Sequence, residues 1–217
     1  MTWFNFWNNK KKINFESNNS CNNFYIGKYS ISVFQIPANN YNISADFFAW
    51  KKNQLSNIII FGDVSGHGER SAAIAYSIIG NFLNKSEYTD ILDCYYDLDC
   101  FVRRIDNNVF STIVIIDFLN NSNIINIING GEIIKLTKAK NGVKNISGTA
   151  GLIGRSKTKQ KAKITTLKLK DKDVIHITTD GWRSNNNEDD DRSFLTLTFN
   201  NDKEVQSDLN QGFILPK

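Results

Sequence analysis

Two segments with helical periodicity follow one another in the middle of a chain whose other apolar segments have the character of β-strands. In the first segment, apolar side chains recur at three- and four-residue steps across residues 72–83, and in the second they do so across residues 91–105. Ser86 is the predicted N-cap of the second helix, with Glu87 and Asp90 in its first turn. Helices that cluster, rather than alternate with strands, favour an α+β fold with antiparallel sheets.

The remaining apolar segments predict strands that are separated by asparagine-rich turns. Two of them, at residues 112–118 and 124–128, flank the turn at residues 120–123 and are expected to form a hairpin. No internal repeat and no long linker interrupts the chain, so we predict one domain over residues 24–217, preceded by an aromatic and basic N-terminal segment at residues 1–23. The other predicted strands are at residues 25–36, 45–50, 58–61, 132–136, 164–169, 174–179 and 194–199.

The composition excludes several classes of protein. The 26 Lys and Arg residues exceed the 22 Asp and Glu residues by only four, which argues against a dedicated nucleic-acid-binding protein. With two histidines, a histidine-rich metal site is excluded. The three cysteines form no CxxC pair, and no segment reaches the roughly 18 apolar residues of a membrane span. We therefore expect a reduced, cytoplasmic protein with no transmembrane segment.

Several acidic residues stand at or beside the ends of predicted strands. Asp46 lies at the start of one strand, while Asp63 and Asp180 follow the ends of two others. The run Glu188-Asp189-Asp190-Asp191 precedes the last long strand, and alone it is typical of a solvated turn. Carboxylates at strand ends are held by a rigid scaffold yet face solvent, and Mg²⁺ and Mn²⁺ prefer such oxygen ligands. Together these positions indicate a site for divalent cations.

The acidic positions belong to short motifs that occur in a definite order. Asp63 lies in the segment GDVSGHG (62–68), which precedes the small residues Ser71, Ala72 and Ala73 at the start of the first helix. Over residues 24–199 the motifs resemble those of the SpoIIE/RsbU/RsbX phosphatases, a bacterial branch of the metal-dependent PPM (type 2C) serine/threonine phosphatases. The other six motifs are SADFF (44–48), FST (110–112), NGGE (129–132), TAGLIG (149–154), TDG (179–181) and DDRS (190–193).

The resemblance implies a fold and a two-metal active site. The fold is an αββα sandwich, in which two antiparallel sheets pack face to face and are flanked by helices. Carried over by motif, Asp63 bridges two Mn²⁺ or Mg²⁺ ions, the main-chain carbonyl of Val64 joins the coordination shell, and Asp46, Asp180 and Asp190 supply the other carboxylates. Asp46, Asp63 and Asp180 are the implied catalytic residues. Two ions about 3.5–4 Å apart activate water for in-line attack on a phosphoryl group, and no phosphoenzyme is required.

Some assignments within the resemblance stay open. Asp189 and Asp191 compete with Asp190 for the place of the fourth ligand, and the alignment with DDRS favours Asp190. The interval from Asp180 to Asp190 is shorter than in most of the family, where helices intervene. His67 has either a substrate-binding or general-acid role, or a role in shaping its loop. Arg183 is a candidate phosphate contact, because a planar guanidinium suits bidentate binding.

The implied function is hydrolysis of phosphoserine and phosphothreonine in proteins. The expected partner is a phosphorylated protein, in particular an STAS-domain protein of the partner-switching type, and the length of the chain is closest to that of RsbX within the family. Two alternatives are an inactive regulator of the same fold that binds a phosphoprotein or an STAS-domain partner, and a metal-dependent hydrolase of small phosphoesters or nucleotides. Retention of an acid at all four ligand positions favours the enzyme over the inactive regulator.

Overall fold

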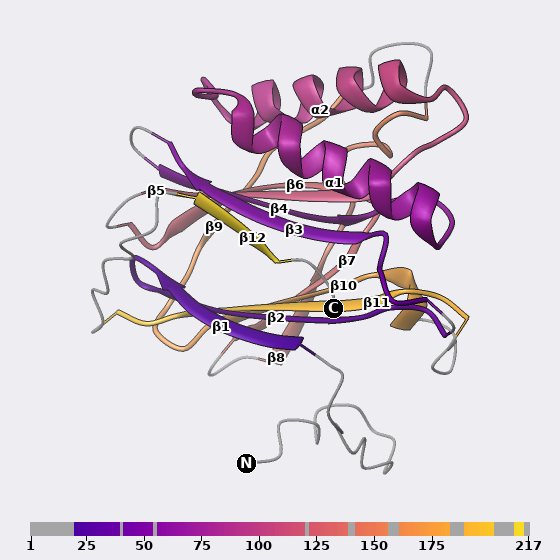
Figure 1. Ribbon diagram of the computed structural model, residues 1–217. Coiled ribbons are helices and arrows are strands. Elements are labelled where there is room, and N and C mark those ends of the chain that lie inside the picture. Colours follow the sequence, from indigo (N-terminus) through magenta and orange to yellow (C-terminus); the bar gives the residue numbers. More distant parts are fainter. Residues whose placement is uncertain are drawn as a thin grey trace.

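Two antiparallel sheets packed face to face, with two helices on one of them, make up the computed structural model (Figure 1). It describes residues 20–39, 41–53, 56–119, 122–138, 142–155, 161–182, 189–201 and 211–214. The first sheet has the order β1-β2-β11-β10-β7-β8, and the second has the order β12-β3-β4-β5-β6-β9. The predicted α+β class and the antiparallel pairing of the 112–118 and 124–128 strands are confirmed.

The elements have the following bounds. The strands of the first sheet are β1 (Ser20–Ile26), β2 (Tyr29–Ile36), β7 (Ile133–Lys138), β8 (Gly142–Ile146), β10 (Val174–Thr178) and β11 (Arg192–Phe199). Those of the second sheet are β3 (Asp46–Lys52), β4 (Ser56–Asp63), β5 (Ile113–Leu119), β6 (Ile124–Gly130), β9 (Thr165–Lys168) and β12 (Gln211–Ile214). The helices are α1 (Glu69–Asn84), α2 (Ile91–Ile105) and the single 3₁₀ turn η1 (Asp180–Trp182).

Strand β4 contributes side chains to two separate hydrophobic cores. Alternate side chains of a strand point to opposite faces. Ile59 and Phe61 enter the core between the two sheets, while Ile58 and Ile60 enter a second core beneath the helices. Burial on both faces explains why this segment is continuously apolar instead of alternating, as is usual for strands covered on both sides.

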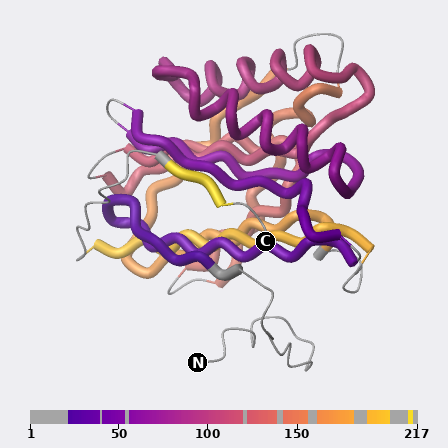
Figure 2. Tube along the Cα trace, viewed as in Figure 1, coloured from indigo at the N-terminus to yellow at the C-terminus, as the bar shows by residue number. Residues whose placement is uncertain are grey.

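Both α-helices lie on the same side of the sandwich, over the second sheet (Figure 1, and the tube in Figure 2). Helix α1 contacts β3, and α2 contacts β5 and β6. The described part of the chain contains no α-helix over the outer face of the first sheet, where the resemblance implied a second helical layer. The short interval between Asp180 and Asp190 accounts for this difference, because β10 and β11 are joined there without room for a helical pair. Neither α1 nor α2 is long and apolar enough to cross a membrane, and no other α-helix is described.

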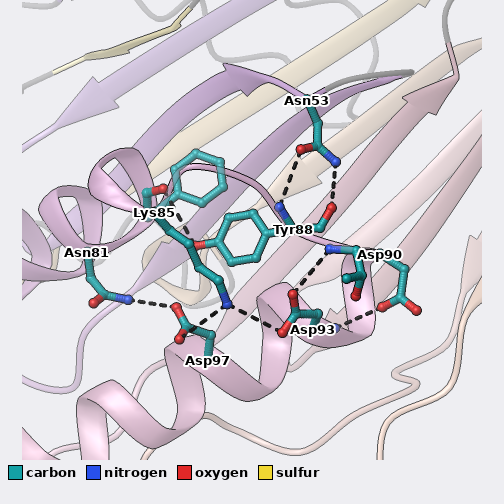
Figure 3. Close-up of polar contacts among 9 residues, drawn as sticks. Asn53, Asn81, Lys85, Tyr88, Asp90, Asp93 and Asp97 are labelled. Atoms are coloured by element: carbon teal, nitrogen blue, oxygen red, sulfur yellow. Dashed lines mark hydrogen bonds and ion pairs between the residues drawn. The ribbon is translucent and has the colours of Figure 1, made fainter.

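The junction between α1 and α2 corrects one prediction (Figure 3). The N-cap of α2 is Asp90, whose carboxylate accepts a hydrogen bond of 2.8 Å from the main-chain N–H of Asp93. The prediction of Ser86 as N-cap is therefore wrong. Lys85 lies between two acids of α2, with its Nζ 3.3 Å from Asp93 and 3.6 Å from Asp97. These ion pairs tie the end of α1 to the first turns of α2, and the helix then begins after Asp90.

A buried lysine joins the same end of α1 to strand β3. The Nζ of Lys51 donates hydrogen bonds to the carbonyl oxygens of Phe82 and Lys85 in the last turn of α1 and just after it. Only 3% of Lys51 is exposed, and burial lowers the pKa of its ammonium group. A cation near the last carbonyls of a helix also complements the helix dipole. Strand β3, which begins at Asp46, is thus held against α1.

Three further strand assignments differ from expectation. The strand predicted at residues 25–36 contains the end of β1, a turn and the whole of β2, because Gly27 adopts a left-handed φ of 53° that reverses the chain; the hairpin itself begins at Ser20. Strand β8 was not predicted, because four of its five residues are exposed and no alternation marks it. Strand β12 was not predicted either, although it pairs with β3. Residues 1–19 lie outside the described part, so the division into segment 1–23 and domain 24–217 stays a prediction.

Candidate metal centre

Two of the predicted ligands face each other across neighbouring strands. Asp46 begins β3, Asp63 ends β4, and the antiparallel register places these two residues directly opposite one another. Residues at such positions have Cβ atoms about 4.5–5.5 Å apart, and like charges there repel. Asp46 is buried and Asp63 is half-buried, so little water separates the two carboxyl groups. The pair forms the centre of the candidate site.

The main chain at Asp63 is held by the segment before β5. The Asp63 N–H donates to the hydroxyl of Thr112 at 3.0 Å, and its carbonyl oxygen accepts from the Thr112 N–H at 2.9 Å and from the Ser111 hydroxyl at 2.7 Å. Gly62 permits this approach, because a Cβ atom there would lie 2.3 Å from the carbonyl oxygen of Thr112. The FST segment thereby fixes Asp63 and leaves its carboxyl group for another partner.

Asp46 has one carboxylate oxygen that is satisfied and one that is not. Its Oδ2 accepts a hydrogen bond of 3.3 Å from the Thr179 hydroxyl. Its Oδ1 is buried and makes no hydrogen bond of ordinary geometry with any described residue. Burial raises the pKa of Asp46 well above its usual range, and the charges of Asp191 and Glu132 add to the effect, which nearby hydroxyls partly oppose. A buried carboxylate oxygen without a donor is costly, and a cation would relieve that cost.

Several acids act on the pKa of Asp63. Burial raises the pKa of Asp63 well above its usual range. The negative charges of Asp46, Glu132, Asp180 and Asp190 raise it further. Asp63 is therefore in the electrostatic field of all three of the other predicted carboxylate ligands.

Asp190 and Asp191 have different tasks. The Oδ1 of Asp191 accepts from the Ala38 N–H and its Oδ2 accepts from the Ala45 N–H, each at 2.7 Å. Asp191 is therefore a positioning residue that holds the chain just before Asp46. Asp190 is half-buried, and one of its carboxylate oxygens accepts from the Asp191 N–H at 3.0 Å. Since both oxygens of Asp191 are engaged, Asp190 is the better candidate for the fourth ligand.

Glu132 is a buried acid at the site that the sequence motifs did not single out. Its Oε1 accepts a hydrogen bond from the Thr112 hydroxyl. The side chain of Asn129 binds the N–H and the carbonyl oxygen of Glu132, at 3.0 and 2.9 Å, and closes the turn between them. Gly131 in this turn has a φ of 117°, which favours glycine. The NGGE motif was the available signal, because its asparagine and glycines place the glutamate.

Asp180 lies in η1, directly after β10, and is exposed. A Cβ atom on the following residue, Gly181, would lie 2.1 Å from the carbonyl oxygen of Asp191. The glycine thus lets the two ends of this connection approach each other, which brings Asp180 near Asp190. Burial and the charge of Asp180 raise the pKa of Asp190.

The other predicted site residues lie at the edge of this group or outside the described chain. Val64 is buried, and its N–H donates to the Ala45 carbonyl oxygen at 3.3 Å. His67 is exposed, its ring lies 5.0 Å from that of Tyr41, and its charge lowers the pKa of Asp190 against the larger effect of burial. Arg183 lies outside the described residues.

The donor set fits a hard divalent cation. The site offers carboxylate oxygens, including the buried Oδ1 of Asp46, which makes no hydrogen bond of ordinary geometry within the described part of the chain. Across the described ranges, no three acidic, histidine or cysteine side chains are already arranged to hold one ion. Binding is therefore expected to draw Asp46, Asp63 and their acidic neighbours closer together, since a cation removes the repulsion between them.

Comparisons with solved structures place this arrangement in a class of phosphatase folds. The chain is similar to RsbX, solved in complex with magnesium, with a TM-score of 0.67 and 14% identity, covering 83% of this chain and 100% of that one. The RsbU and RsbW domains of Rv1364c from Mycobacterium tuberculosis have a TM-score of 0.68 and 17% identity, over 81% and 61% of the two chains. The PP2C phosphatase domain of SpoIIE from Bacillus subtilis has a TM-score of 0.63 and 12% identity, over 80% and 62%.

The sequence itself identifies the family. Residues 56–211, more than half of the 217-residue chain, match the family model described as stage II sporulation protein E (SpoIIE). The chain belongs to the SpoIIE family, which confirms the resemblance inferred from the motifs. No curated protein sequence matches the chain.

Proposed function

We propose that this protein is a metal-dependent phosphatase that hydrolyses phosphoserine and phosphothreonine in proteins, with two Mn²⁺ or Mg²⁺ ions. The cross-strand pair of Asp46 and Asp63 is the observation that carries the proposal. It combines two desolvated carboxylates with a buried Asp46 oxygen that makes no hydrogen bond of ordinary geometry with any described residue. Membership of the SpoIIE family and the fold shared with serine/threonine phosphatases support the same conclusion.

The roles of the residues follow from their contacts. When bound, the ions supply Lewis-acid polarisation of the phosphoryl group and a lowered pKa for water. Asp46, Asp63, Asp180 and Asp190, with the carbonyl oxygen of Val64, hold the ions in this proposal. The hydroxyl of Thr179 orients Asp46, and the Ser111 and Thr112 contacts orient Asp63. Asp191 keeps the start of β3 in place.

The proposed substrates are phosphorylated STAS-domain proteins of partner-switching systems, acted on in the cytoplasm. Structures named for RsbX and RsbU, and one from a study of the bacterial stressosome, share the fold of this chain. That likeness supports the substrate class. Either an STAS-domain phosphoprotein or a synthetic phosphoserine peptide serves as a probe.

The test is Mn²⁺-dependent release of phosphate from an aryl phosphate and from a phosphoserine STAS-domain protein. We expect wild type to hydrolyse both and Asp63→Asn to hydrolyse neither. Asp117→Asn is the matched control, because Asp117 is a half-buried acid at the opposite end of the same sheet, beside Ile58 rather than Asp63. Absence of turnover by wild type on both substrates would contradict the proposal, and turnover of the aryl phosphate alone would indicate a small-molecule substrate.

A further inference from the structure

An exposed arginine makes a cation–π contact with an exposed phenylalanine next to the candidate metal centre. The Cζ atom of Arg155 lies 5.6 Å from the ring centroid of Phe110. Phe110 is 37% exposed, Arg155 is exposed, and Arg155 forms no ion pair with any described residue. Neither side chain takes part in the proposed binding of metal.

Main-chain contacts hold this pair beside the loop that carries Asp63. The Ser65 N–H donates to the Phe110 carbonyl oxygen at 2.9 Å, and the Phe110 N–H donates to the Ser65 hydroxyl at 3.3 Å. Ser111, next to Phe110, exchanges two main-chain hydrogen bonds of 2.9 Å with Ile153. The Ser111 hydroxyl also binds the Asp63 carbonyl oxygen, so Phe110 and its neighbour Ser111 both contact the loop that carries Asp63 directly.

The segment before Arg155 is anchored on its other side by a buried acid. The Gly154 N–H donates to Oδ1 of Asp99 at 3.0 Å, and Oδ2 of Asp99 lies 2.8 Å from Arg103. Gly154 has a φ of 82°, and a Cβ atom there would lie 2.4 Å from Val102. Arg155 therefore projects from a fixed main chain, and binding a ligand would order little beyond its own side chain.

The N–H donors of Arg155 are open to a ligand, because the side chain is exposed and forms no ion pair with any described residue. A guanidinium can bind a carboxylate in a bidentate manner. An exposed cation beside the site attracts a substrate whose acidic side chain reaches it, and disfavours one that carries a neutral side chain there.

We propose that Arg155, in cation–π contact with Phe110, is a specificity-determining residue that binds an acidic side chain next to the phosphorylated residue of the protein substrate. The inference rests on the proposed phosphatase function and adds a preference for acidic sequence around the phosphoserine. Phe110 is the positioning residue, because its ring contacts the guanidinium while its main chain is bonded to Ser65 of the loop that carries Asp63.

The test uses two phosphoserine peptides that differ only in having Glu or Gln on both sides of the phosphoserine. Wild type should prefer the Glu peptide by about tenfold in kcat/KM, the size expected for a charge-assisted bidentate contact. Arg155→Ala should abolish this preference and Arg155→Glu should reverse it, with aryl phosphate turnover unchanged within about twofold. Arg104→Ala, which removes another exposed arginine, at the end of α2, should leave the preference intact.

Each contrary outcome has a distinct meaning. If Arg155→Ala keeps the preference for Glu, the inference is wrong. If it lowers aryl phosphate turnover about tenfold, Arg155 serves the phosphoryl group and the inference is wrong in another way. If wild type hydrolyses nothing, the proposed function fails. Binding of the two peptides by fluorescence anisotropy then still decides whether Arg155 selects acidic sequence.

Discussion

Asp46 and Asp63 occupy directly opposed positions of β3 and β4, so that two acids, one buried and one half-buried, share one end of this strand pair. Like charges directly opposite one another weaken a sheet, and burial strengthens the repulsion. The chain nonetheless holds both residues firmly, Asp46 through Thr179 and Asp63 through Ser111 and Thr112. Such a costly arrangement is expected where function requires it.

Replacement of Asp63 by asparagine should increase the stability of the metal-free protein while it abolishes most of the phosphatase activity. We expect Asp63→Asn to raise the free energy of unfolding of the metal-free protein by about 1 kcal/mol, because the cross-strand repulsion is removed. Phosphatase activity should fall at least about a hundredfold in the same variant, as expected when a metal-ligating acid is lost. Urea unfolding in the presence of a chelator measures the first effect. A destabilised metal-free variant would show that Asp63 serves mainly as a structural residue.

The stabilising effect of Asp63→Asn should depend on pH. Burial raises the pKa of both Asp46 and Asp63 in the folded protein, while in the unfolded chain the carboxyls titrate near 4. Below the pKa of the unfolded chain, both acids are protonated and make their full contribution to the free energy of unfolding. That contribution is lost as the pH rises through the raised pKa of the folded protein, because the buried carboxyls then ionise. The advantage of Asp63→Asn over wild type should be large at pH 7.5 and shrink as the pH falls toward 4. Thermal unfolding in chelator measures it, and a pH-independent difference would count against the raised pKa.

Asp191 should support the site by holding the main chain at Ala38 and Ala45, without binding metal itself. Asp191→Ala leaves the buried N–H groups of Ala38 and Ala45 without acceptors, which should cost about 2–4 kcal/mol of stability. Asp191→Asn keeps one acceptor oxygen and should cost less. Calorimetric titration should show weaker Mn²⁺ binding in the alanine variant at a temperature where it remains folded. Unchanged stability and affinity would contradict the positioning role.

Two glycines offer a matched comparison. A methyl group at Gly181 would lie 2.1 Å from the carbonyl oxygen of Asp191. Because the main chain cannot move away as easily as a flexible side chain, Gly181→Ala should lower the free energy of unfolding by about 2–3 kcal/mol and also reduce activity. Gly80 lies inside α1 with no atom within 4 Å of a Cβ there. Gly80→Ala should be stabilising by about 0.5–1 kcal/mol and leave activity unchanged. Equal stability of the two variants in urea would argue against the close approach at Gly181.

The sequence indicates candidate ligands, but it does not indicate the residues that hold them in place. Asp46, Asp63 and Asp180 were recognisable because each stands at a strand end, and local periodicity defines those ends. The task of Asp191 depends on N–H groups at Ala38 and Ala45, about 150 residues away in the chain, which no local pattern encodes.

Errors in the predicted elements have similar causes. Ser86 and Asp90 are both good N-cap residues within one loop, and the ion pairs of Lys85 accompany the choice of Asp90. The exposed strand β8 lacks alternation, because only its last residue is buried. In each case tertiary contacts, and not local preference, determine the outcome.

The most direct test of the central claim is anomalous diffraction at the manganese edge from crystals soaked in Mn²⁺. The account predicts two strong anomalous peaks beside Asp63, with Asp46, Asp180 and Asp190 as the neighbouring carboxylates, and no such peaks in Asp63→Asn. Peaks confined to sites away from Asp46 and Asp63, or none at saturating Mn²⁺, would contradict it.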